Sequence, residues 1–135
     1  MARRPDSTAR SATGASHASA SGERARGVIR GATYFLLRSA FPSDAAIAEF
    51  AGVDRSRVTR FKQGRNLESD TAALLDAVGS VVTLLRGFLD DAVIPDWLRG
   101  ANAHLGYRIP LDVLKTGRLS EVIAAIEAEK SGAFA

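Results

Sequence analysis

Apolar residues of this chain recur at helical spacing in separate blocks, each closed by glycine or proline. The first block begins at Gly27 and ends before Pro42, because the residue that precedes a proline is disfavoured in the helical conformation. We expect its apolar positions to form the buried face of a first helix: Val28, Ala32, Phe35, Leu36 and Ala40.

Two short helices are predicted next, on either side of Gly52. Ser43 is suited to cap the first of them, over residues 44–51, and Asp44 lies where a negative charge favours the helix dipole. Gly52 supplies a turn in which a positive φ costs little. Asp54 can cap the second helix, which runs to about Gln63 and stops at Gly64.

A longer helix is predicted from about Asp70, and we expect Gly79 to bend it. Its apolar positions are Leu74, Val78, Val81, Leu84, Leu85 and Leu89. Further along, Pro110 can open a short helix at its first turn, and Gly117 closes that helix. The last helix has its apolar positions at Leu119, Val122, Ile123 and Ile126. The sequence has no alternation typical of strands, so the expected fold class is all-α.

The length of 135 residues allows one compact domain, or two small helical modules that share one core. The chain contains no cysteine, which excludes disulfide bonds, cysteine zinc sites and thiol nucleophiles. It has no signal-peptide h-region and no uncharged apolar stretch of the roughly 18 residues needed to cross a bilayer. We therefore expect a cytoplasmic protein that makes no membrane contact.

The net charge of +3 is unevenly distributed along the chain. Residues 55–65 contain five basic residues and no acid, whereas residues 71–135 contain six bases and eight acids. The basic run is typical of a surface that faces phosphate. Residues 1–26 are rich in Ser, Ala and Arg, and this composition predicts a disordered basic leader. Such a leader either adds non-specific attraction to DNA or has no role.

The segment from Ser43 to Gly64 has the pattern of a helix-turn-helix. Small Ala48 lets the two helices approach, and Val53 fills the gap below the turn. The inward-facing positions are Ile47, Phe50, Val58 and Phe61. The opposite face of the second helix carries short polar groups with arginines on both sides, which suits the major groove of DNA. The alternative interpretation is a helical hairpin whose arginine face is merely solvated.

This segment resembles the Xre-type helix-turn-helix of bacterial and phage repressors, in its Gly-Val-polar turn and its Arg-Ser-x-Val-x-Arg-Phe-x-x-Gly run. The resemblance implies base-reading roles for Arg55, Ser56 and Arg60. It implies mostly phosphate contacts for Arg57, Thr59, Lys62, Gln63 and Arg65. Asp44 departs from the pattern, because such folds often place a neutral polar group there and an acid would repel DNA.

Residues 97–135 resemble the toxin-binding domain of the Xre/MbcA/ParS antitoxins, the partners of RES-domain toxins. The matching features are Trp97-Leu98, Asn102, the Leu105-Gly106 turn, Pro110-Leu111-Asp112 with Leu114, Gly117, Val122 and the terminal Gly132-x-Phe134. Together with the helix-turn-helix, the resemblance covers roughly residues 30–135. It predicts a helix-turn-helix bundle that a long shared helix fuses to a small toxin-binding module.

This resemblance implies an antitoxin that binds and neutralises an NAD-consuming RES-domain toxin and represses its own operon on operator DNA. We expect a homodimer within a hetero-oligomeric complex. The implied toxin-binding residues are Pro110, Leu111, Leu114, Gly132, Ala133, Phe134 and Ala135. The tail offers small residues, one aromatic anchor and a free carboxylate, which suits insertion into a cleft. In the alternative interpretation, Phe134 folds back on Ile126.

The expected organisation is a leader over 1–26, a helix-turn-helix region over 27–69, a connecting helix and linker over 70–96, and a toxin-binding domain over 97–135. Trp97 is expected in the core against residues 85–89, where it would join the two modules. Asn102 is expected to brace a helix end or a loop.

The sequence shows no catalytic constellation, so we expect no enzymatic activity, no cofactor and no metal site. His17 and His104 lie far apart, and a metal site between His104, Asp90 and Asp91 has little support. No glycine-rich phosphate loop is present. Two alternatives to the antitoxin remain: a free-standing helix-turn-helix repressor without a toxin partner, and an interaction module whose helix-turn-helix has lost DNA binding.

Overall fold

The structure is a computed structural model that describes Gly22 and residues 30–133, and all regular elements within these residues are helical. Residues 30–40 form the first described helix. It is followed by α2 (Asp44–Ala51), α3 (Arg55–Lys62), α4 (Ser69–Arg86), the 3₁₀ turn η1 (Asp91–Val93), α5 (Ile94–Arg99), the 3₁₀ turn η2 (Ala103–Leu105), α6 (Pro110–Lys115) and α7 (Leu119–Ala133). The predicted all-α class is confirmed.

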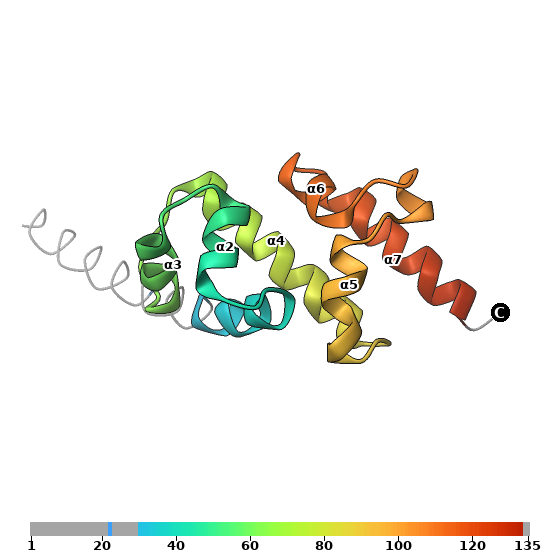
Figure 1. The fold of residues 1–135 in the computed structure, drawn as a ribbon, viewed down its shortest axis with the longest axis horizontal. Coiled ribbons are helices and arrows are strands. Elements are labelled where there is room, and N and C mark those ends of the chain that lie inside the picture. Colours follow the sequence, from blue (N-terminus) through green and yellow to red (C-terminus); the bar gives the residue numbers. More distant parts are fainter. Residues whose placement is uncertain (1–21, 23–29, 134–135) are drawn as a thin grey trace, which may run out of the picture.

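Helix α4 connects the two ends of the molecule (Figure 1). At one end, α2 and α3 lie beside the N-terminal half of α4, and α5, α6 and α7 lie towards the other end. The turn between α6 and α7 also borders the first half of α4. A single hydrophobic core extends from Tyr34 to Ile126 through both ends. Helix α4 places five fully buried side chains in this core: Leu75, Val78, Val81, Val82 and Leu85. None of the described helices is long and apolar enough to cross a membrane.

Local signals around α2 act as the sequence predicts. The Ser43 hydroxyl accepts a hydrogen bond from the Ala46 N–H at 3.1 Å, so it caps the helix. Gly52 ends the helix in the left-handed conformation, with φ of 70°. Asp54 occupies the N-cap position of α3, but its side chain makes no capping hydrogen bond. Pro110 is in the first turn of α6, and Gly117 follows that helix with φ of 79°.

The buried face of the first described helix differs from the predicted one. Phe35, predicted to face inward, is 72% exposed, and Ala32 is exposed as well. The buried positions of this helix are Tyr34, Leu37 and Ala40, and Phe41, which directly follows the helix, is buried as well. Residues 34–37 are all apolar or aromatic, so helical spacing alone fits either face. The predictions for Val28 and the leader fall outside the described residues, apart from Gly22, which is helical.

Gly79 does not interrupt α4, which is continuous through this buried residue. A Cβ atom at position 79 would lie 3.0 Å from Cγ2 of Thr33, so the glycine permits close approach of the first described helix. Leu74 is only partly buried and Leu84 is 36% exposed, whereas Leu75 and Val82 are fully buried. The buried face of α4 therefore differs from the predicted one and includes Leu75 and Val82 in place of Leu74 and Leu84.

Trp97 packs against the hydrophobic core, but its side chain is only partly buried. Its indole Nε1 donates a hydrogen bond to Glu129 of α7, at 2.5 Å. A cation over an aromatic ring adds a contact between α6 and α2. Nζ of Lys115 on α6 lies 5.2 Å from the ring centre of Phe50 on α2.

Candidate functional site

The α2–turn–α3 unit has the geometry of a helix-turn-helix. Val53 donates its N–H to the carbonyl of Ala48 at 3.0 Å, which closes the turn after Gly52. Val58 and Phe61 are fully buried, so they fix the inner face of α3. The opposite face of α3 must then point away from the core.

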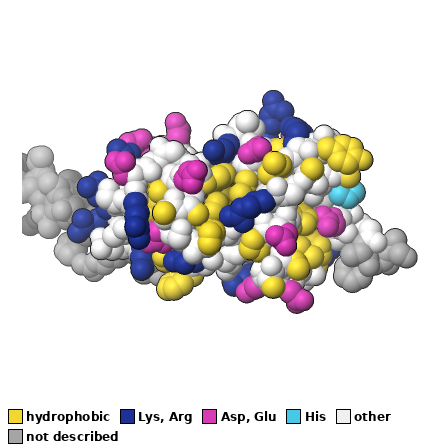
Figure 2. Space-filling view, in the orientation of Figure 1, with side chains coloured by type: hydrophobic (Ala, Val, Ile, Leu, Met, Phe, Trp, Pro, Cys, Tyr) yellow, Lys and Arg dark blue, Asp and Glu magenta, His cyan; other side chains and the backbone are white. Residues whose placement is uncertain are grey.

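That outer face carries the predicted DNA-contacting residues. The exposed members are Arg55, Ser56, Thr59, Arg60, Lys62, Gln63 and Arg65. The guanidinium groups of Arg55, Arg60 and Arg65 form no ion pair within the part of the chain that the structure describes. Figure 2 shows basic side chains gathered at this end of the molecule. This face presents unpaired positive charges beside short polar groups, which is the composition that a DNA-reading helix requires.

Two of the predicted phosphate contacts are already engaged within the chain. Arg57 forms an ion pair with Glu68, and this hydrogen bond raises the pKa of Arg57 above its ordinary value. Nζ of Lys62 lies 5.2 Å from the centre of the Tyr34 ring. A phosphate would have to compete with Glu68 for Arg57. Arg55, Arg60 and Arg65 have no such competitor among the described residues, so they are the better candidates for a DNA contact.

The carboxylate of Asp44, the acid that departs from the Xre pattern, has a hydrogen-bond donor and a positive charge beside it. Its Oδ1 accepts a hydrogen bond from the Tyr34 hydroxyl at 2.6 Å and lies 3.5 Å from Nη1 of Arg38. The guanidinium of Arg38 also donates to the Tyr34 hydroxyl and to the carbonyl of Pro42. The hydrogen bond to Tyr34 contributes most to raising the pKa of Arg38. The carboxylate therefore has a partner of opposite charge, which reduces the repulsion expected from the sequence.

At the other end of the molecule, the predicted contacts on α6 are core residues. Pro110 is buried, Leu111 is 6% exposed and Leu114 is 2% exposed. Helix α6 turns these side chains towards α4, α5 and α7. The surface of these three side chains is already used in packing within the chain, and their contact with a partner stays a prediction.

The predicted tail contacts lie at the end of α7. Gly132 is exposed and Ala133 is the last residue of the helix. Phe134 and Ala135 fall outside the described residues.

Asn102 holds together the loop between α5 and α6. It is 9% exposed, and its side-chain oxygen accepts a hydrogen bond from the His104 N–H at 2.9 Å. Its carbonyl accepts from the N–H groups of Leu105 and Tyr107, and its own N–H donates to the carbonyl of Arg108. Asn102 and Arg108 thereby form an isolated antiparallel bridge. The loop from 102 to 108 is thus closed by several hydrogen bonds to one residue.

This loop displays Tyr107, which the sequence analysis did not single out. Its φ is 66°, which makes it the sole residue other than glycine with a positive φ among those described. A tyrosine in this region costs about 1 kcal/mol or more. Its ring is nevertheless 74% exposed, so little burial offsets that cost. The Leu105-Gly106 turn was the only sequence signal here, and it does not reveal a second left-handed residue.

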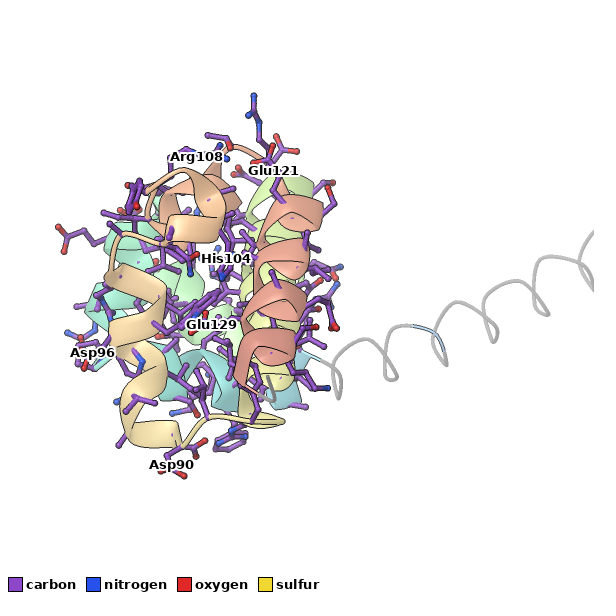
Figure 3. The ribbon with its side chains drawn as sticks, turned by 90° about the vertical axis from the view of Figure 1, so that its right-hand side faces the viewer. Asp90, Asp96, His104, Arg108, Glu121 and Glu129 are labelled. Carbon is purple, nitrogen blue, oxygen red and sulfur yellow. The ribbon has the colours of Figure 1, made fainter. Side chains whose placement is uncertain are left out.

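The side chains considered for a metal site do not come together among the described residues. Figure 3 places Asp90 at the far end of α5 from His104. No cluster of three potential metal ligands exists among the described residues. The ion pairs of this end, such as Arg108 with Glu121 at 2.7 Å, link neighbouring elements on the surface (Figure 3). His17 falls outside the described residues.

The chain matches no model of a known protein family, no curated protein and no solved structure. The functional interpretation therefore rests on the motifs that carry the resemblance described above and on the arrangement of these residues.

Proposed function

We propose that this protein is an antitoxin of the Xre/MbcA/ParS type, which neutralises a RES-domain toxin through its C-terminal end and represses its own operon through α3. The observation that carries the DNA-binding part is the outer face of α3. Arg55 and Arg60 stand there without an ion pair among the described residues, on a helix that Val58 and Phe61 hold in place. Arginines so placed can bind guanine edges in the major groove.

The antitoxin part is supported by the separation of two surfaces along α4. The basic face of α3 lies at one end, and the C-terminal helices lie at the other (Figure 1). A toxin bound to the C-terminal helices would leave the basic face of α3 free to bind DNA. In this proposal the protein is cytoplasmic and forms a homodimer within a complex with the toxin and operator DNA. The proposed role requires no enzymatic activity and no cofactor.

A free-standing helix-turn-helix repressor is the second candidate. It is favoured by the burial of Pro110, Leu111 and Leu114, which removes three of the residues that the resemblance implies for toxin binding. In that case the C-terminal helices would serve only to complete the core around α4.

Co-expression with the product of the adjacent gene separates the two candidates. The antitoxin is expected to co-purify with a RES-domain protein and to preserve the cellular NAD that this toxin alone depletes. Footprinting of the purified chain on its own upstream DNA tests the shared part, with protection of an inverted repeat as the expected result. Absence of co-purification, together with a clear footprint, would favour the free-standing repressor.

A further inference from the structure

Tyr107 combines an unfavourable backbone conformation with an exposed aromatic ring. Its φ of 66° is fixed by the loop, since its N–H donates to the carbonyl of Asn102 at 2.8 Å. The ring itself is 74% exposed and so contributes little to folding. Glycine would satisfy the same backbone without strain, as Gly106 does at the preceding position with φ of 65°. The side chain at this position therefore has a cost that the fold alone does not explain.

The ring borders a shallow groove of about 450 Å³ between the loop and α6. Ile109 and Val113 supply apolar lining, and Arg108 and Arg118 supply the basic lining. Figure 2 shows exposed hydrophobic side chains next to the histidine at this end of the molecule. We call the surface formed by Tyr107, Ile109 and Arg118 the Tyr107 patch; Val113 lies beneath it and is 2% exposed.

The two arginines of the groove share one carboxylate unequally. Arg108 donates to Oε2 of Glu121 at 2.7 Å, whereas Arg118 lies 3.6 Å from Oε1, beyond hydrogen-bond distance. The Arg118 side chain is 59% exposed. A carboxylate from outside could bind Arg118 without displacing the Arg108–Glu121 pair. The patch therefore offers an aromatic anchor beside a cation that still has donors free.

From these observations we propose that the Tyr107 patch is the surface that docks the protein partner. The Tyr107 ring enters an apolar socket on that partner, and Arg118 receives a carboxylate at the rim of the socket. The inference rests on the proposed function, because it takes the toxin as this partner.

The test titrates the purified toxin with the full chain and with three variants. Tyr107→Gly and Arg118→Ala each remove one feature of the patch. Phe35→Ala is the matched control, because Phe35 is exposed to 72% but lies on the first described helix. We expect each patch variant to lose at least tenfold in toxin affinity, about 1.4 kcal/mol, and the control to stay within twofold of the unmodified chain.

A thermal melt of Tyr107→Gly distinguishes docking from a structural role. We expect its midpoint to be at least as high as that of the unmodified chain, because glycine relieves the positive φ. A lower midpoint that parallels the lost affinity would overturn the proposal, and so would undiminished toxin binding. A change in the oligomeric state of the free Tyr107→Gly chain would assign the patch to self-association instead. If the unmodified chain fails to bind the toxin, the proposed function and this inference both fail.

Discussion

The hydroxyl of Tyr34 donates a hydrogen bond to Oδ1 of Asp44 at 2.6 Å, which ties the first described helix to the start of α2. Tyr34 is 4% exposed, so water cannot easily replace its hydroxyl as the donor to Asp44. We expect Tyr34→Phe to lower the free energy of unfolding by about 1 kcal/mol. Urea denaturation measures this change. Tyr107→Phe is the control, because the exposed Tyr107 ring should leave the free energy of unfolding unchanged; an equal loss in both variants would contradict the argument.

Arg60 is expected to read a base, because its guanidinium is exposed and forms no ion pair among the described residues. Arg60→Ala should cost roughly 1–3 kcal/mol of operator affinity and relax the preference at one base position. Lys62→Ala should weaken binding to all sequences alike and lower the salt dependence. The measurement is a titration of operator and scrambled DNA at several salt concentrations. Lys130→Ala, on the exposed end of α7, is a charge-matched control that should bind as the unmodified chain does.

The close approach at Gly79 predicts opposite effects for two Gly→Ala substitutions. At position 79, a Cβ would lie 3.0 Å from Thr33, so the alanine should destabilise the protein by about 1 kcal/mol or more. At position 31, a Cβ meets nothing within 4 Å, and alanine in a helix should stabilise by about 0.5–1 kcal/mol. Denaturation midpoints of the two variants check the signs. A gain in stability at position 79 would show that the two helices are not held this closely.

Arg86 holds Asp91 through two hydrogen bonds, of 3.0 and 2.9 Å, and these lower the pKa of Asp91 below its ordinary value of 3.8. The unfolded chain therefore binds this proton more tightly than the folded chain does. The resulting stability is fully present above pH 3.8 and is lost as the pH falls through the lower folded value. Asp91→Asn should be less stable at neutral pH and lose less stability on acidification. Asp90→Asn is the control, and an identical acid response in both variants would refute the role of the pair.

Removal of residues 132–135 should weaken toxin binding at least tenfold and leave operator binding intact, because the tail is remote from α3 along the chain. The reverse result is expected for the double variant Arg55→Ala, Arg60→Ala, which should still rescue cells from the toxin. Parallel titrations of toxin and operator measure both activities. A truncated chain that still inhibits fully would leave the Tyr107 patch as the main contact.

The helix-turn-helix could be predicted closely because its signals are local. Ser43, Gly52 and the Val58–Phe61 pair each determine a cap, a turn or an inner face within a few residues. The prediction placed the wrong side of the first described helix in the core, because the run from Tyr34 to Leu37 has no charged residue to mark the outer face. Only tertiary contacts, such as the one between Tyr34 and Asp44, decide which side is buried.

The C-terminal end was harder to predict for a different reason. A family-like motif contains both residues that build the fold and residues that touch a partner, and the sequence does not separate them. Pro110, Leu111 and Leu114 belong to the first kind in this structure. Tyr107 was missed because its distinguishing property is a backbone angle, which depends on hydrogen bonds to Asn102.

The position of α4 in the core also has a consequence for proteolysis of the chain. The buried side chains of α4 belong to one core that includes both ends of the molecule, so neither end has a separate core that would survive the loss of the other. A protease that requires unfolded chain would therefore gain access to the α3 face and the Tyr107 patch in the same opening event. Degradation would end the proposed repression and the proposed protection from the toxin together, and the half-life of both proposed activities would be set by a single opening equilibrium.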